Sequence, residues 1–261
     1  MEERARVDLA DLCLPQELLH WIGSSPVYES SGKSGARTVY VDRDGGAYLK
    51  IADRGSLSLA SQMQTYFAAH NMSSPVLRYL SADRDYLITA PVQGEAGTSE
   101  KYLAGPHRLS EVFGQSLRRL HETDPQNCPA SGKTSALLRL ADTTAFLQPH
   151  LDEIIDYIGA AQAESAPAEI AAMGGLLRDD VLIHGDYCLP NIILGDWAFA
   201  GFIDVADSGV GDRHYDLVWG LWTLAWNLHS SKYGARFLDS YGRELIDKDR
   251  LRVCGLLAAM E

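Results

Sequence analysis

Three residues in the second half of the chain, Asp186, Asn191 and Asp204, have types and spacings that could carry out phosphoryl transfer. Phosphoryl transfer requires little covalent chemistry from the protein. It requires that the acceptor hydroxyl group is oriented and that the charge of the phosphate groups is neutralised. A carboxylate such as that of Asp186 can orient the hydroxyl group. A second carboxylate and an amide oxygen can hold Mg²⁺, which prefers hard oxygen ligands. We therefore predict Asp186 as the catalytic residue, and Asn191 and Asp204 as Mg²⁺ ligands.

The spacing of Asp186 and Asn191, Asp-x-x-x-x-Asn, is that of the kinase catalytic loop. Taken singly, each residue is explained as well by a polar turn or an ordinary loop. Taken jointly they favour a functional site, because His184 and Gly185 precede them and short apolar strands frame them. We expect a hairpin after Asn191, whose return places Asp204 beside it.

The elements that must position these residues begin with a strand-rich part. Residues 26–51 are expected to form strands around a turn at 42–46, where Asp and Gly are concentrated. A helix is predicted over 56–69, and two more strands follow before Gly94. This order is typical of a small antiparallel sheet with one packed helix.

After Gly94 the pattern becomes helical. Leu109, Phe113 and Leu117 recur at helical spacing and mark one buried face. Further helices are expected over 143–160 and from about 214 onward. We therefore predict an α+β fold of two lobes, with domains 1–94 and 95–261.

Composition narrows the class of partner. The chain has 261 residues, 46% of them hydrophobic, and a net charge of −12. Such a charge repels nucleic acid and anionic membranes and attracts cationic solutes, although it can also serve solubility alone. The four cysteines form no CxxC pair, and no signal peptide or 18-residue apolar run is present. We expect a cytoplasmic protein, a monomer or weak dimer, that acts on a small cationic molecule.

The segment from His184 to Asn191 resembles the modified catalytic loop of the aminoglycoside phosphotransferases, most closely their 3'-phosphotransferase branch. Residues 202–204, Phe-Ile-Asp, are similar to the metal-binding segment of that family, and 211–216 to the stretch that follows it. Residues 117–121 also resemble a family stretch. The likeness covers nearly the whole chain.

The resemblance implies a protein-kinase-like fold with a nucleotide-binding lobe (1–94) and a catalytic and substrate-binding lobe (95–261). It also implies ATP and Mg²⁺ as cofactors, and phosphorylation of an aminoglycoside hydroxyl group that confers antibiotic resistance. Another small hydroxylated antibiotic or metabolite remains an alternative acceptor.

Roles in the first lobe come from the same resemblance. Ser34, in a loop of small residues, would help to cover the nucleotide phosphates, although the loop could be only a flexible turn. Lys50 would reach the α- and β-phosphates, unless it is a solvated lysine at a strand edge. Ala90 and Val92 would bind adenine. Because Pro91 has no N–H, Val92 is the expected donor and Ala90 the acceptor.

The chain departs from the family in the helix at 56–69. The family pairs its strand lysine with a glutamate on this helix, at a position that falls on or beside Ser61. No acidic residue lies between Asp53 and Asp83. A non-catalytic, nucleotide-binding protein is therefore the alternative of a different class, although it would have no chemical need for the three residues of the second lobe.

A second departure concerns the acceptor. The family holds its polyamine sugars with carboxylates near the C-terminus, where this chain has Ala258 and Ala259 and retains only Glu261. Asp156 is a further acidic candidate. Three tryptophans at 219, 222 and 226 stand where family members place charged groups. Their helical spacing favours buried packing; the other interpretation is an aromatic wall for a flatter or less charged acceptor.

Overall fold

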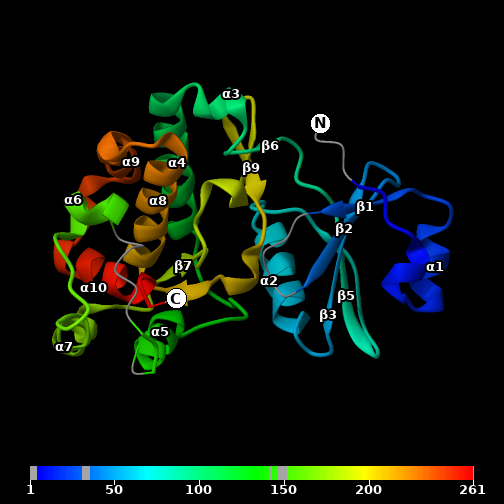
Figure 1. The fold of residues 1–261 in the computed structure, drawn as a ribbon, viewed down its shortest axis with the longest axis horizontal. Helices are drawn as coiled ribbons and strands as arrows, with labels where there is room; N and C mark the ends of the chain where they lie inside the picture. The colour runs from blue at the N-terminus through cyan, green and yellow to red at the C-terminus, as the bar shows by residue number, and fades with distance from the viewer. Residues whose placement is uncertain (1–4, 31–35, 142, 146–151, 261) are drawn as a thin grey trace. The chain divides into compact units, whose positions relative to one another are not determined.

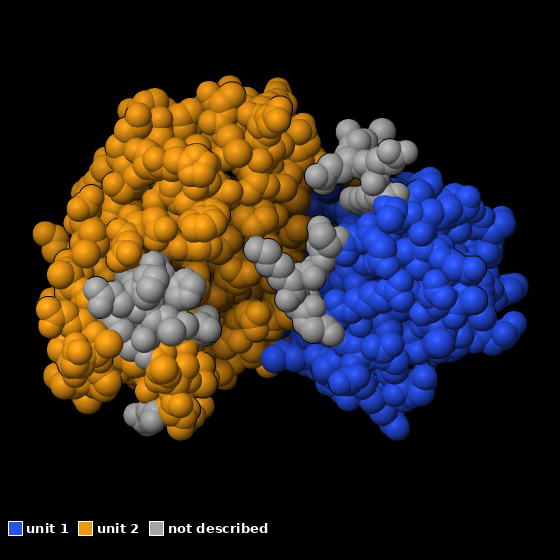
Figure 2. Space-filling view, in the orientation of Figure 1, with its two compact units in different colours: residues 1–92 blue, residues 93–261 orange. Residues whose placement is uncertain are grey.

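The computed structural model describes residues 5–30, 36–141, 143–145 and 152–260. The chain divides into two compact units, residues 1–92 and residues 93–261 (Figure 2). The sequence predicts the boundary at Gly94, whereas the packing divides the chain after Val92.

Unit 1 is built on one five-stranded antiparallel sheet with the order β1-β2-β3-β5-β4 (Figure 1). Its strands are β1 Val27–Ser30, β2 Arg37–Val41, β3 Ala47–Asp53, β4 Val76–Ser81 and β5 Arg84–Thr89. The predicted turn at 42–46 joins β2 to β3. There Gly45 and Gly46 adopt positive φ angles of 92° and 95°, a conformation that glycine reaches without strain.

The predicted helix of unit 1 is present as α2, Ser58–Ala69. It buries Ala60, Met63 and Phe67, which are spaced to lie on one face. Its first turn is capped from the sheet, because the buried Asp85 carboxylate accepts the Leu57 N–H at 2.9 Å. This hydrogen bond ties the start of α2 to strand β5.

Two further elements precede the sheet and were not expected from the sequence. They are the 3₁₀ turn η1, Leu9–Leu12, and the short helix α1, Gln16–Ile22. Leu12, Leu18 and Ile22 bury their side chains in one hydrophobic cluster with strand residues such as Val39 and Leu49. The N-terminal segment therefore belongs to the core of unit 1.

Unit 2 is mainly helical, with two small sheets of order β6-β8-β9 and β10-β7. Their strands are β6 Glu95–Ala96, β7 Val181–Ile183, β8 Ile192–Gly195, β9 Ala198–Phe202 and β10 Gly209–Gly211. Its helices are α3 Glu100–Leu103, α4 Pro106–His121, α5 Lys133–Ala141, α6 Ile155–Ile158, α7 Ala166–Met173, α8 Arg213–Leu228, α9 Gly234–Tyr241 and α10 Lys248–Ala258. Helix α4 packs against α9, and α8 against α10 (Figure 1). At the α4–α9 contact, a Cβ on Gly114 would lie 2.4 Å from the Phe237 carbonyl oxygen, so only glycine fits. The predicted α+β fold is confirmed.

The helix expected over 143–160 is wrong in its extent. Helix α5 ends at Ala141, and α6 covers only Ile155–Ile158. Pro149 has no N–H and disfavours the helical conformation of the residue before it, so a helix across 143–160 would lose a hydrogen bond at its middle. Gly159, with φ 76°, then ends α6. Among the described helices, none is long and apolar enough to cross a membrane.

Candidate active site

The three predicted residues of the second lobe lie on one loop and one hairpin of unit 2. Strand β7, Val181–Ile183, leads into His184, and strands β8, Ile192–Gly195, and β9, Ala198–Phe202, form the expected antiparallel hairpin. The Ile203 N–H donates to the Asn191 carbonyl oxygen at 2.9 Å. The hairpin therefore brings Ile203 opposite Asn191, and Asp204 is the next residue in the chain.

Asp186 and Asn191 are joined directly. The Asn191 Nδ2 group donates to the Asp186 Oδ2 atom at 2.8 Å and to the Asp186 carbonyl oxygen at 3.0 Å. Asn191 is buried and Asp186 is half-buried. Because both donor contacts lie on one side of the amide, its oxygen faces the other way. The amide thus orients the carboxylate while keeping a hard oxygen available for a cation.

His184 ties this loop to the hairpin. Its Nε2 lies 3.1 Å from the Ile203 carbonyl oxygen, and the Asp186 N–H donates to its Nδ1 at 3.3 Å. One neutral tautomer, with the proton on Nε2, satisfies both contacts. The ring is fully buried, so its position is set by packing as well as by these bonds. The imidazole therefore holds the backbone of Asp186 and that of Ile203, next to Asp204, in one frame.

A buried carboxylate on α8 holds the start of the loop. Asp216 Oδ2 accepts the His184 N–H at 2.7 Å, and its Oδ1 accepts the Gly185 N–H at 2.9 Å. Its Oδ2 also lies 3.1 Å from the Nε2 atom of His121. Asp216 is fully buried. Burying a carboxylate is costly unless donors surround it, and here three donors from two other segments do so.

His121 continues this network to α9. Its Nδ1 lies 2.8 Å from the Tyr241 hydroxyl group. Burial lowers the pKa of His121 and raises the pKa of Tyr241 to about 12. Both groups are therefore neutral at pH 7, with the His121 Nε2–H donating to Asp216 and the Tyr241 hydroxyl group donating to Nδ1.

Backbone conformation at two loop positions is also special. Gly185 has φ 84°, and a Cβ there would lie 2.4 Å from the Asp207 carbonyl oxygen. Asp204 has φ 59° and ψ 46°, in the left-handed region that few non-glycine residues adopt. Such conformations are concentrated at functional sites, where the surrounding structure enforces them.

The residue types fit a magnesium ion. Asn191 supplies an amide oxygen and Asp204 a carboxylate, both hard donors. Within the described part of the chain, no group of three or more His, Cys, Asp or Glu side chains could hold a metal alone. An ion at this place would therefore complete its shell with phosphate and water oxygens, as Mg²⁺ ordinarily does beside a nucleotide.

The predicted nucleotide-binding residues lie in unit 1. Lys50 is half-buried on β3 and lies between Thr38 of β2 and Leu87 of β5, so it is central in the sheet and not at its edge. Helix α2 carries no acidic residue that could pair with it. Ser34 lies outside the described residues.

The two predicted adenine-binding positions follow the end of β5. The Ala90 N–H donates to the Pro75 carbonyl oxygen at 3.1 Å, and its own carbonyl oxygen accepts the Ser74 hydroxyl group at 2.5 Å. A carbonyl oxygen has two lone pairs, so this acceptor can still receive a second donor. Among the described residues, the Val92 N–H has no hydrogen-bond partner.

The acceptor candidates separate. Ala258 and Ala259 are buried, so the altered C-terminal positions are part of the core, and Glu261 lies outside the described residues. Asp156 lines a cavity of about 380 Å³, which Trp226 also lines. The expectation that the tryptophans of α8 are buried is wrong: Trp219 and Trp222 are half-buried, and the Trp226 side chain is 58% exposed.

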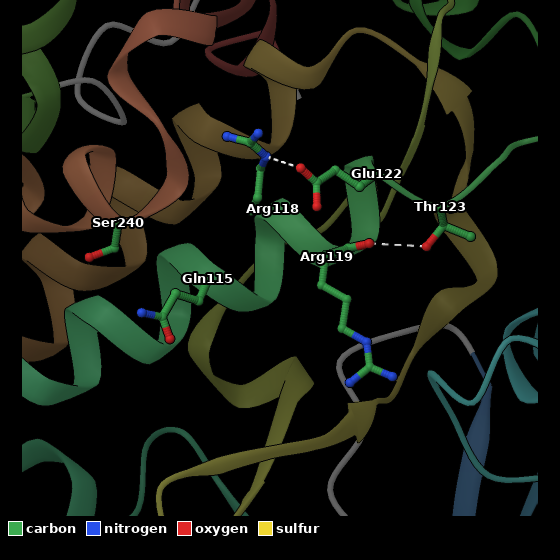
Figure 3. A pocket seen from close by; sticks show the side chains of 6 residues that line it. All are labelled: Gln115, Arg118, Arg119, Glu122, Thr123 and Ser240. Atoms are coloured by element: carbon green, nitrogen blue, oxygen red, sulfur yellow. Dashed lines mark hydrogen bonds and ion pairs between the residues drawn. The ribbon is translucent and has the colours of Figure 1, made fainter.

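A second cavity, of about 410 Å³, lies between α4 and Ser240 of α9. Figure 3 shows the side chains that line it. The Arg118 guanidinium that lines it donates to the Glu122 carboxylate and, at 3.0 Å, to the Tyr241 carbonyl oxygen. The Arg119 guanidinium lies over the Phe199 ring, 5.1 Å from its centroid. The contacts with Tyr241 and Phe199 join α4 to α9 and β9, and none of the predicted site residues lines this cavity.

A family model and the curated relatives of this chain point to the same protein family. Residues 30–255 match the family model of the phosphotransferase enzyme family. A probable aminoglycoside 3'-phosphotransferase from Lactococcus lactis subsp. lactis (strain IL1403) is 38% identical, over 92% of this chain and 92% of the relative. An aminoglycoside 3'-phosphotransferase from Niallia circulans is 27% identical, over 91% of this chain and 94% of that protein.

A solved structure agrees in fold. It is an aminoglycoside phosphotransferase from Streptomyces rimosus ATCC10970 in complex with ADP and streptomycin. It is 23% identical, with a TM-score of 0.68, and the match covers 97% of this chain and 98% of that chain.

Proposed function

Because the chain belongs to the phosphotransferase enzyme family, we propose that it transfers the γ-phosphoryl group of ATP to a hydroxyl group of an aminoglycoside antibiotic, in the manner of the 3'-phosphotransferases. The observation that carries this proposal is the pair of Asp186 and Asn191, 2.8 Å apart on a loop beside the hairpin that bears Asp204. The names of the relatives support the acceptor class.

In this reaction the Asp186 carboxylate accepts a hydrogen bond from the acceptor hydroxyl group and thereby orients the hydroxyl oxygen toward the γ-phosphorus atom. The new bond joins this oxygen to the phosphorus atom while the bond to the β–γ bridging oxygen breaks, and ADP leaves. The hydroxyl proton passes to the Asp186 carboxylate and then to water. Asn191 and Asp204 would hold Mg²⁺, which neutralises the charge of the phosphate groups.

Unit 1 would hold the nucleotide. Lys50 pairs with phosphate oxygens, the loop with Ser34 covers them, and the Val92 N–H and Ala90 carbonyl oxygen meet the adenine edge. Helix α2 has no acidic residue, and Lys50 lies in the centre of the sheet, between Thr38 and Leu87.

The biological result would be resistance. A phosphate group adds negative charge to a cationic antibiotic, and this charge opposes binding to the anionic ribosomal RNA. The acidic net charge of −12 suits a cationic acceptor. We place the protein in the cytoplasm, where ATP and the antibiotic target are both present.

The test is release of ADP in the presence and absence of Mg²⁺, with kanamycin, neomycin and streptomycin as acceptors. Glucose and ethanolamine serve as controls without an aminoglycoside scaffold. The Asp186→Ala variant should lose turnover. The matched control is Asp196→Asn, a change at an exposed carboxylate in the β8–β9 turn, which should keep the wild-type rate.

Two results would contradict the proposal. The mechanism fails if Asp186→Ala keeps the wild-type rate. If the protein binds ATP and turns over none of the aminoglycosides, the acceptor assignment fails. The missing acidic residue of α2 would then favour a nucleotide-binding protein without this activity.

A further inference from the structure

The cavity that contains Asp156 has two walls of different chemistry. Its volume is about 380 Å³. One wall is the end of α8 and the turn that follows, with Ala225, Trp226, His229, Ser230 and Ser231. The other wall consists of Asp152, Glu153 and Asp156. No lysine or arginine is among these lining residues.

The exposed face of the first wall is a tryptophan held in place by its neighbours. The Trp226 ring stacks on the Trp222 ring at a centroid distance of 5.8 Å and an interplanar angle of 20°. Trp222 in turn meets Trp219 edge-to-face at 5.6 Å. Trp226 is 58% exposed, more than any other large hydrophobic residue in the described ranges. An indole that is both exposed and fixed in orientation offers a ready flat surface for a ligand.

The second wall is acidic. Asp156 Oδ2 accepts the Ser231 hydroxyl group at 3.4 Å. Glu153 Oε2, by contrast, is buried from solvent and has no hydrogen-bond partner within the described residues. Asp152 and Asp156 are exposed, so their carboxylates, unlike the buried Glu153 Oε2 atom, can pair with an ammonium group in the cavity.

Helix α8 connects this cavity to the catalytic loop. The Thr223 hydroxyl oxygen accepts the Leu189 N–H at 3.1 Å, and Leu189 lies between Asp186 and Asn191 in the loop. Trp226 follows Thr223 by three positions, so it lies on the same side of the helix and about 4.5 Å further along its axis. The helix therefore fixes the cavity wall relative to the catalytic loop.

We propose that Trp226 is a specificity-determining residue for the acceptor: an amino-sugar ring stacks its C–H face on the indole, while its ammonium groups pair with Asp156. This inference rests on the proposed aminoglycoside kinase function. A second copy of the chain is a poor occupant, because it would bring further negative charge to an acidic wall. Stacking partly replaces charge pairing here, so acceptors with fewer ammonium groups are tolerated.

The test compares Trp226→Ala, Trp226→Phe and Asp156→Asn, with Leu176→Ala as control for loss of an exposed hydrophobic side chain outside the cavity. Trp226→Ala should raise the KM for kanamycin about tenfold with kcat within about twofold, on the scale of aromatic and cation–π contacts. Trp226→Phe should restore most of the affinity, and Leu176→Ala should change nothing. At 0.5 M NaCl the effect of Asp156→Asn should shrink, because salt screens ion pairs, while that of Trp226→Ala persists.

Calorimetric binding of kanamycin to the Asp186→Asn variant, with and without Trp226→Ala, separates this inference from the proposed function. Absence of turnover by the wild-type protein would overturn the function. Equal kanamycin affinity with and without Trp226 would overturn the inference, whether or not the wild-type protein turns over an acceptor. Weaker binding without the indole, restored by phenylalanine, supports it.

Discussion

Replacing Asp216 with asparagine tests whether the buried carboxylate of α8 positions the catalytic loop. In the wild-type protein its two oxygens accept the N–H groups of His184 and Gly185 and the Nε2–H of His121. The amide can keep only one oxygen. The less costly orientation keeps the two contacts of Oδ2 and turns the NH₂ group toward the Gly185 N–H.

One charge-assisted hydrogen bond is then lost and one buried N–H is left without an acceptor. A hydrogen bond to a charged group contributes about 1.5–3 kcal/mol, so we expect the free energy of unfolding to fall by roughly 2 kcal/mol. For a chain of this size that corresponds to a Tm decrease of about 4–8 °C. Because Gly185 directly precedes Asp186, we also expect kcat to fall at least tenfold, with the KM for ATP within about twofold.

The assay pairs thermal and denaturant unfolding with steady-state release of ADP. The matched control is Asp212→Asn, a second buried carboxylate at the start of α8. It accepts bonds from Arg178, His214 and Arg250 and none from the catalytic loop. The control should lose stability and keep kcat. If Asp216→Asn keeps both the stability and the kcat of the wild-type protein, the reasoning about this carboxylate is refuted.

Three further predictions concern the same region. Hydrogen bonds from the His214 side chain and the Arg178 N–H outweigh burial and lower the pKa of Asp212 from 3.8 to about 2, so its carboxylate stabilises the fold above pH 3.8 by roughly 2 kcal/mol. Unfolding curves should show the gap between wild type and Asp212→Asn closing as the pH falls from about 4 to about 2; a constant gap would contradict this. Asp204→Asn should raise the Mg²⁺ concentration for half-maximal turnover about tenfold or more, measured by Mg²⁺ titration of ADP release; an unchanged titration would remove Asp204 from the metal site. Gly185→Ala should lower the Tm and abolish turnover, because its Cβ would meet a carbonyl oxygen at 2.4 Å and φ is positive; wild-type values for both would show that the loop can relax.

The parts of the site that could be predicted from sequence are local. The loop with Asp186 and Asn191 and the hairpin that returns Asp204 span few residues, and their turn and strand patterns are visible in the chain itself. The central place of Lys50 in its sheet follows from strand order, which sequence patterns did not define. The predicted hairpin is confirmed by the antiparallel pairing of β8 and β9. It was predictable because two strands joined by a short connection have few other arrangements.

The parts that were missed depend on contacts distant in sequence. Asp216 lies 31 and 32 positions from the two N–H groups it accepts. A single acidic residue followed by an apolar helix was the available signal, since such a carboxylate must find donors. Trp226 shows the other limit. Helical spacing defines a common face for the tryptophans but not how far a neighbouring element covers it.

Helix α8 also sets a length. Asp216 near its beginning fixes the backbone next to Asp186, and Trp226 near its end forms the wall of the acidic cavity. Asp216 and Trp226 are ten positions apart, which corresponds to about 15 Å along the helix axis. Because the helix is continuous, this distance is fixed. A small metabolite with one hydroxyl group could reach the catalytic carboxylate and would still leave the cavity empty. If Trp226 binds the acceptor, the helix favours acceptors long enough to occupy both the catalytic loop and the cavity.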